Sequence, residues 1–298
     1  MAADRLLDLV CFSYLADAQV MHVDTYPLPN SGAAVDATAA SIAGDGPLTA
    51  ITAARLGLRT GLIANSVGAD HTGQRLRGWL DHFGVDHNVH AVAGTATPHL
   101  TVIADRGTRT WFAALTHAYA DLLTADLALL TRTRLAYIDC YHVIADAAAR
   151  AVAAAQDTPL LLNLGGDQPS PDVIAAARSR RLLTVQTSVD DSAVDSAADV
   201  ADTLFHLFAP HTVVVTVGRH GAFARTRHQL HRVAAPEAAI HHTHGAGAAF
   251  SAGYARAILT GADIDTALTV GCNAGTQHCA SPAALVPRQI PADVLTTV

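Results

Sequence analysis

Short apolar runs alternate with alanine-rich amphipathic stretches along most of this chain. The apolar runs are bounded by turn or helix signals, and we expect buried strands at 7–12, 62–66, 135–138, 160–164, 182–185 and 213–217. The stretches between them predict helices at 47–56, 72–83, 145–156 and 199–207. Strands and helices that alternate in this way form a mostly parallel sheet with helices on both faces. The pattern therefore predicts a layered α/β fold.

Two segments interrupt this alternation and predict a small separate sheet. Strand-like runs at 99–104 and 109–113 flank the turn at 105–108, which is typical of a β-hairpin, and 20–23 supplies another strand. A sheet that projects from an α/β body would cover a ligand at the carboxyl ends of the parallel strands. We therefore expect residues 1–298 to form one domain, with lid segments at about 18–45 and 96–114.

A glycine-rich turn late in the chain predicts an anion-binding site. Gly245, Ala246 and Gly247 precede a helix whose apolar positions fall on one face, namely Phe250, Tyr254, Ala257 and Ile258. Backbone N–H groups at the start of a helix have no intrahelical acceptor, and the helix dipole favours negative charge there. Phosphate is the expected ligand of this turn.

Composition excludes several classes of enzyme. The chain has 298 residues, half of them apolar, and its net charge of −7 includes no clustered basic block, which argues against a nucleic-acid partner. All 19 basic residues are Arg, and Glu237 is the only glutamate. Without lysine there is no Walker P-loop and no Schiff-base chemistry, and GxSxG and complete GxGxxG motifs are absent. Four cysteines without CxxC spacing, and no signal peptide or spanning segment, favour the cytoplasm and no membrane partner.

Several motifs occur in the order that one enzyme family shows. They are GDG at 44–46, ARLG at 54–57, VGADHTG at 67–73, GV at 84–85, TVGRHGA at 216–222 and HTHGAGAAF at 242–250. With these motifs the chain resembles, over nearly its whole length, the PfkB family of carbohydrate kinases, the ribokinase-like group of sugar and nucleoside kinases. The resemblance implies a three-layer ribokinase-like fold with a small β-sheet lid.

The resemblance also implies an activity and a set of site residues. The activity is ATP-dependent phosphorylation of a hydroxymethyl group on a sugar or nucleoside, with Mg²⁺. Gly245, Ala246 and Gly247 would bind the transferred phosphoryl group. The nucleotide site would use Thr216, Gly218, Gly221 and Asn273, and the substrate site Asp17, Gly44, Asp45, Gly46, Leu48 and the lid residue Arg109. Alternatives stay open for three of these residues: Asp17 could cap a turn, Asn273 could satisfy a backbone group, and Arg109 could be a solvated hairpin charge.

The chain departs from the family pattern at the residue that accepts the proton. The family places an aspartate after Gly-Ala-Gly, whereas this chain has Ala248. A positioned acid or base contributes about 10²–10⁴-fold to a rate, while phosphoryl transfer relies mainly on alignment and charge stabilisation. We therefore expect binding to persist while turnover is close to lost, whether Ala248 is an engineered substitution or a natural loss.

Two further departures concern the metal and the substrate. The family's Asn-x-x-Glu motif is altered, and Thr187 to Asp190 offers only a weak substitute. Leu15 and Leu48 stand where the family often has asparagines, which predicts a more apolar pocket and favours a nucleoside or modified sugar over a hexose.

Other hypotheses about the function, the proton acceptor and the assembly remain open. The chain could be a non-catalytic ligand-binding or regulatory protein, or His244 could accept the proton. His241, His242 and His244 suggest a metal site, but a chain with 17 histidines produces chance clusters, and we expect no bound metal there. The edges of the lid sheet suggest a homodimer.

Overall fold

A nine-stranded sheet forms the centre of the molecule. The computed structural model describes residues 6–105, 109–115 and 117–281. The strand order is β15-β14-β13-β12-β11-β10-β1-β4-β6, and the strands from β6 to β13 are parallel whereas β14 and β15 are antiparallel. The strands are β1 (Leu7–Phe12), β4 (Thr60–Ile63), β6 (Asp86–His87), β10 (Thr133–Asp139), β11 (Leu160–Asn163), β12 (Leu182–Ser188), β13 (Thr212–Thr216), β14 (Ala222–Thr226) and β15 (Leu230–Val233).

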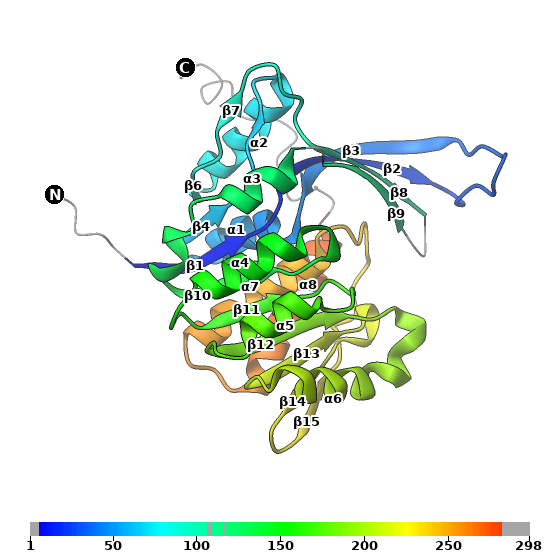
Figure 1. The fold of residues 1–298 in the computed structure, drawn as a ribbon. Coiled ribbons are helices and arrows are strands. Elements are labelled where there is room, and N and C mark those ends of the chain that lie inside the picture. Colours follow the sequence, from blue (N-terminus) through cyan, green and yellow to red (C-terminus); the bar gives the residue numbers. More distant parts are fainter. Residues whose placement is uncertain (1–5, 106–108, 116, 282–298) are drawn as a thin grey trace.

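Helices cover both faces of this sheet (Figure 1). One layer contains α1 (Asp45–Arg55), α2 (His71–His82), α7 (Ala246–Leu259) and α8 (Ile264–Ala280), and the other contains α3 (Ala118–Thr124), α4 (Ala145–Ala154), α5 (Pro171–Ala177) and α6 (Ala197–Phe208). Four short 3₁₀ helices are η1 (Ala128–Thr131), η2 (His142–Ile144), η3 (Asp191–Ser196) and η4 (Gly218–His220).

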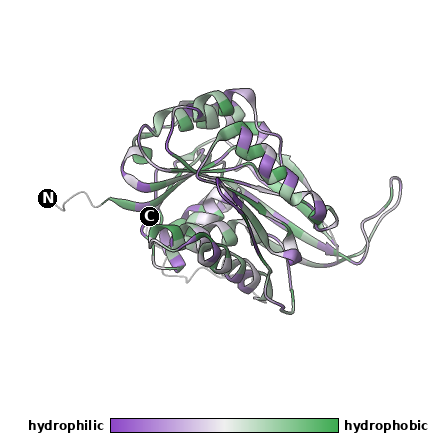
Figure 2. Cartoon of the chain, turned by 90° about the horizontal axis from the view of Figure 1, so that it is seen from below, coloured by the Kyte–Doolittle hydropathy of each residue, from purple (hydrophilic) through white to green (hydrophobic). Residues whose placement is uncertain are grey.

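The alternation of side chains along β1 explains the three layers. Leu9 and Cys11 pack in the hydrophobic core of the first helix layer, whereas Val10 and Phe12 pack in the core of the second. Successive side chains of a strand point to opposite faces, so a continuously apolar strand is buried on both sides. The helices in turn show alternating hydrophobic and hydrophilic bands (Figure 2). Within the described ranges, no helix is both long and apolar enough to cross a membrane.

Helix boundaries follow local capping chemistry. The Asp70 carboxylate accepts the Gly73 amide at 2.7 Å at the start of α2, and Asp263 caps α8 by accepting the Thr266 amide at 2.8 Å. Such caps satisfy amides that have no intrahelical acceptor. After α1, Gly57 adopts φ +90°, a conformation that glycine reaches without steric cost.

The lid is a separate four-stranded sheet in the order β3-β2-β8-β9. It consists of β2 (Ala16–Val23), β3 (Val35–Ala43), β8 (His99–Ala104) and β9 (Arg109–Ala114), and it projects to one side of the layered body (Figure 1). A third, two-stranded sheet pairs β5 (Val67–Gly68) with β7 (Ala91–Val92).

These observations confirm the expected fold class, a mostly parallel α/β body with a separate small sheet. The strand expected at 7–12 and the hairpin strand at 99–104 have the expected bounds, although residues 106–108 of the hairpin turn lie outside the described residues. The strand expected at 62–66 is wrong in its bounds, because β4 ends at Ile63 and the chain then leaves the sheet. Strand β3 was not expected, since its Ala, Asp, Thr and Ser residues lack a clear apolar alternation.

Candidate functional site

The Gly-Ala-Gly turn forms the start of α7. Gly245 is the residue before the helix and adopts φ +79°, ψ +4°, a left-handed conformation that favours glycine. Among the described residues, the amides of Gly245, Gly247 and Ala248 have no acceptor, whereas the Ala246 amide donates to the Thr243 carbonyl at 3.3 Å. Three unpaired N–H groups at a helix start can bind an anion.

Gly247 leaves room for that anion. The residue is exposed, and a Cβ added to it would meet no heavy atom within 4 Å. Its φ lies outside the left-handed region, so neither its backbone conformation nor its packing in this structure requires glycine. The space in front of this residue is available to a ligand.

Ala248 carries a methyl group at the position of the expected proton acceptor. The residue is fully buried, and its carbonyl accepts a hydrogen bond from Thr49 Oγ1 of α1 at 3.3 Å. An alanine side chain has no lone pair to accept a proton. The structure thus places a proton-inert side chain in the first turn of α7.

Two histidines fix the segment that leads into this turn. The ring Nε2 of His244 lies 3.0 Å from the Ile42 carbonyl at the end of β3, and His278 Nε2 of α8 lies 2.7 Å from the His244 carbonyl. A carbonyl only accepts, so each Nε2 carries a hydrogen and each Nδ1 holds a lone pair in the neutral ring. Burial lowers the pKa of His244, and it lowers the pKa of His278 to about 4. Both rings are therefore neutral at pH 7.

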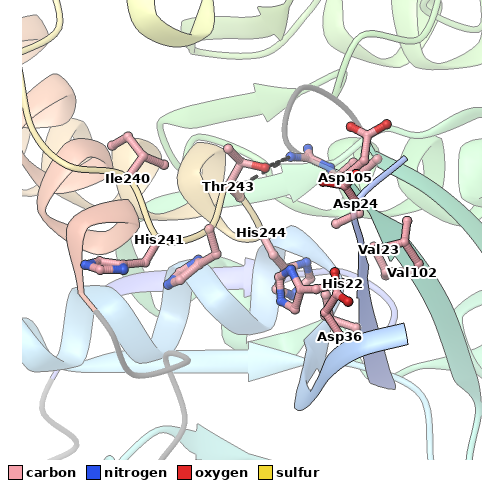
Figure 3. A pocket seen from close by; sticks show the side chains of 14 residues that line it. His22, Val23, Asp24, Asp36, Val102, Asp105, Ile240, His241, Thr243 and His244 are labelled. Atoms are coloured by element: carbon pink, nitrogen blue, oxygen red, sulfur yellow. Dashed lines mark hydrogen bonds between the residues drawn. The ribbon is translucent and has the colours of Figure 1, made fainter. Parts of the chain in front are cut away.

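A cavity of about 380 Å³ lies between the lid and this segment. Residues of β2, β3, β8 and β9 form one wall and residues 240–244 form the other, so that His244 lies toward His22 and Asp36 of the lid (Figure 3). Arg109 of β9 joins the two walls, because its guanidinium donates to the Thr243 carbonyl at 3.2 Å and contacts the Thr243 hydroxyl at 3.4 Å. Arg109 is thus a lid residue in contact with the loop before Gly245.

Asp17 lies at the base of the lid and not on the wall of this cavity. It stands opposite Ile42 in the pairing of β2 with β3, one strand from the His244 contact. Its carboxylate accepts a hydrogen bond from the Arg75 guanidinium of α2 at 2.5 Å. Any substrate hydroxyl that Asp17 binds would have to share this carboxylate with Arg75.

The two leucines expected to make the pocket apolar lie elsewhere. Leu15 and Leu48 are 0% and 1% exposed and pack in the hydrophobic core around α1 and α7. Neither lines the cavity beneath the lid. The wall of this cavity includes the carboxylates of Asp24, Asp36 and Asp105, and a substrate pocket made apolar by the two leucines stays a prediction.

The glycines at 44 and 46 allow α1 to begin close to the end of β1. A Cβ at Gly44, which has φ +97°, would lie 2.1 Å from the Tyr14 carbonyl, and one at Gly46 would lie 2.4 Å from Ser13 Cβ. The Gly46 amide donates to Asp139 Oδ2 at 2.8 Å. Close backbone approach explains both glycines without a ligand.

Asp139 is the centre of a buried polar cluster that sequence reasoning missed. Its carboxylate accepts hydrogen bonds from Ser13 Oγ at 2.5 Å and from Asn163 Nδ2 at 2.8 Å. Asn163 also donates to Asp45 Oδ2 at 3.2 Å, and the Tyr141 hydroxyl donates to the same oxygen at 2.6 Å. Burial and the nearby Asp45 charge raise the pKa of Asp139, whereas the hydrogen bonds from Ser13, Asn163 and the Gly46 amide oppose the shift. An aspartate directly after the apolar strand at 135–138 was the signal that could have found it.

The loop expected to bind nucleotide is shaped by close backbone contacts. A Cβ at Gly221, which has φ +88°, would lie 2.0 Å from the Val233 carbonyl, and one at Gly218 would lie 2.0 Å from Asp191 Oδ1. Thr216 Oγ1 contacts the Thr187 carbonyl at 3.4 Å, and Asn273 is exposed on α8. These glycines have structural reasons to be present, and the nucleotide contacts of the four expected residues stay a prediction.

The substitute for the Asn-x-x-Glu motif is not supported at Thr187 and Asp190. Thr187 is 5% exposed within β12, and Asp190 caps η3 by accepting the Ser192 amide at 2.9 Å. The next residue, Asp191, lies against Gly218 in the expected nucleotide loop and pairs with Arg219 at 3.6 Å. Asp191 is therefore the carboxylate that the fold brings to this loop.

A contact between two histidine rings and a second cavity involve none of the expected site residues. The rings of His242 and His278 pack edge to face with centroids 4.7 Å apart, and in the described part of the chain no three His, Cys, Asp or Glu side chains are grouped as metal ligands. A cavity of about 790 Å³ near the amino ends of β12 and β13 is lined by Leu183, Phe205, His211 and neighbours, and by none of the expected site residues.

The fold and the candidate site define an α/β protein with a separate four-stranded sheet and a helix start whose amides lack acceptors among the described residues. Residues 7–289 match the model of the pfkB family of carbohydrate kinases, and the chain belongs to this family. It is 26% identical over 296 residues to a nucleoside kinase of Methanothermobacter thermautotrophicus, which covers 89% of this chain and 86% of that protein.

Solved structures show the same fold. The ribokinase of Arabidopsis thaliana, solved with ribose and ATP, has a TM-score of 0.73 at 18% identity, covering 94% of this chain and 95% of that one. The nucleoside kinase of Methanocaldococcus jannaschii has a TM-score of 0.73 at 14% identity, covering 98% and 97%.

Proposed function

We propose that this chain is an ATP-dependent phosphotransferase for a hydroxymethyl group of a sugar or nucleoside, with low turnover because Ala248 replaces the proton acceptor. The observation that carries this proposal is the start of α7, where three amides have no acceptor among the described residues and follow directly after Thr243 and His244, which line the cavity beneath the lid. Membership of the pfkB family and the similarity to a nucleoside kinase support it.

The site supports binding better than it supports proton transfer. The amides of Gly245, Gly247 and Ala248 would hold the transferred phosphoryl group, and the lid would exclude water from it. The acceptor hydroxyl attacks the γ-phosphorus, the bond to ADP breaks, and the hydroxyl proton must leave. Because Ala248 cannot take that proton, we expect a rate lower by about 10²–10⁴-fold than with a positioned carboxylate.

ATP is supported by the similarity to known kinases, whereas Mg²⁺ has one candidate carboxylate in this chain. The similarity to a ribokinase solved with ATP supports ATP as the phosphoryl donor. Mg²⁺ usually binds through one or two carboxylates together with the phosphates and waters, and Asp191 beside the expected nucleotide loop is the candidate. When bound, the ion would neutralise charge on the phosphates.

The test combines binding and turnover. We expect calorimetry to detect ATP binding to the natural chain, and we expect Ala248→Asp to increase ATP consumption with at least one member of a panel of nucleosides and sugars. Ala248→Asn is the matched control, since it has the same size without a basic carboxylate. Absence of turnover by Ala248→Asp with every acceptor, in a protein that is folded, would contradict the kinase proposal.

A non-catalytic ligand-binding protein is the second candidate. It is favoured by the buried methyl group of Ala248 and by the Arg75 guanidinium that already occupies Asp17. This candidate predicts that a small metabolite binds while ATP binding is undetectable by the same calorimetry.

His244 is an alternative proton acceptor. Its Nε2 is engaged by the Ile42 carbonyl and its lowered pKa keeps the ring neutral, so that Nδ1 can accept a proton. If His244 has this role, His244→Ala abolishes residual turnover while the protein stays folded.

Assembly and location also remain proposals. We propose a cytoplasmic protein that pairs through the edges of the lid, since β3 and β9 are the outer strands of that sheet. Sedimentation velocity of the natural chain and of a variant with charged residues on β9 would test the dimer.

A further inference from the structure

An exposed tryptophan, Trp111, lies on the face of the lid sheet that borders the cavity. Trp111 of the edge strand β9 is 59% exposed, and it pairs with Val102 of β8 in the antiparallel register. Directly paired residues of neighbouring strands have their side chains on the same face of the sheet. Val102 lines the cavity, so the Trp111 ring lies on the cavity face of the lid.

The register of β9 gives independent support for this orientation. Arg109 lines the cavity and contacts Thr243, and Trp111 is two residues further along the strand. Because side chains alternate along a strand, Arg109 and Trp111 share one face and Phe112 has the other. The Phe112 residue is 58% exposed, about as much as Trp111, but its side chain lies on the opposite face of the lid sheet.

We propose that Trp111 is a stacking platform for the flat heterocyclic base of a nucleoside acceptor bound in the cavity beneath the lid. Trp111 does not itself line the cavity, but its strand partner Val102 does, together with Val20 of the next strand. An indole on the same face as these apolar side chains suits a flat ring. The ribose would then lie toward the base of the lid, where Asp17 is located. This inference rests on the proposed function, and it narrows the acceptor from sugars and nucleosides to nucleosides.

Calorimetry with a nonhydrolysable ATP analogue present would test the platform. The probes are adenosine, inosine, cytidine and uridine, with D-ribose as the ligand that lacks a base. Stacking of one base on an aromatic side chain predicts that Trp111→Ala weakens nucleoside binding about 5- to 150-fold. We expect Trp111→Phe to retain most of the affinity, and D-ribose binding to be unchanged by either substitution.

Phe112→Ala is the matched control, since it removes an equally exposed aromatic ring from the other face of the same strand. We expect it to change nucleoside affinity less than twofold. Equal losses in Trp111→Ala and Phe112→Ala, or an equal loss of D-ribose binding, would overturn the proposal. So would a Trp111→Ala variant that alters sedimentation but not nucleoside affinity, since Trp111 would then be a contact between copies of the chain.

Fluorescence provides a second measurement. The chain has two tryptophans, and the other, Trp79, is 3% exposed, so Trp79→Phe leaves Trp111 as the only indole. We expect nucleosides to quench this variant and D-ribose to leave its emission unchanged. If the natural chain binds nucleosides without quenching, only the platform is wrong. If it binds neither the ATP analogue nor any acceptor, the proposed function fails as well.

Discussion

Substitution of Gly247 separates the ligand role of the α7 start from its structural role. Gly247 is the second residue of α7, and an added Cβ would meet nothing within 4 Å. Alanine is more favourable than glycine in a helix by about 1 kcal/mol, so we expect Gly247→Ala to raise the free energy of unfolding by about 0.5–1 kcal/mol. A substitution that stabilises the fold can still impair binding at this position.

The same methyl group would obstruct a bound phosphate. The Cα–Cβ bonds of a helix tilt toward its N-terminus, so the methyl group that Gly247→Ala adds would project toward the space in front of α7. Loss of one hydrogen bond to a charged group costs about 1.5–3 kcal/mol, which corresponds to about 10- to 150-fold weaker ATP binding. Denaturant unfolding and calorimetry with ATP measure the two effects on the same sample.

Gly253 in the same helix is the control, because packing requires glycine there. A Cβ at Gly253 would lie 2.8 Å from Ala274 Cβ and 2.8 Å from the Val270 carbonyl of α8. We expect Gly253→Ala to destabilise the fold by about 1–3 kcal/mol through overpacking, with unchanged ATP affinity of the folded protein. The reasoning is refuted if Gly247→Ala binds ATP as the natural chain does, because the phosphate then does not approach this helix start.

Three further changes test the structure around the site. We expect Gly221→Ala to cost at least about 2 kcal/mol in denaturant unfolding, since its φ is +88° and the Val233 carbonyl would lie 2.0 Å from the new Cβ. The pKa of His278 falls from 6.5 to about 4 on folding, so the unfolded chain binds more protons between these values, and stability is lost as pH falls from about 6.5 toward 4. Thermal melts across this range should show a smaller loss for His278→Gln. Arg109→Gln should change stability by less than about 0.5 kcal/mol yet speed amide hydrogen exchange in β8 and β9, because it removes the guanidinium that bonds to Thr243 across the cavity. Unchanged exchange would show that this contact does not hold the lid.

Local sequence patterns predicted much of the fold and the helix start that forms part of the candidate site. The run at 7–12 is β1 with the expected bounds, because its residues from Leu9 to Phe12 are continuously apolar, as is typical of a strand buried on both faces. The Gly-Ala-Gly sequence before an amphipathic stretch also located the start of α7, since glycine conformation and helix-start amides are properties of adjacent residues. Sequence alone thus determined the layered α/β class, the lid hairpin and the absence of a carboxylate at Ala248.

Contacts between distant residues were decided only by the tertiary structure. The Arg75 guanidinium on Asp17 and the His244 ring on the Ile42 carbonyl join positions 58 and 202 residues apart, respectively. Periodicity shows which residues share a face of one element, but it does not show which elements become neighbours or in what register. For the same reason the sequence could not tell that Trp111 faces the cavity and Phe112 faces away, because that difference depends on the pairing of β9 with β8.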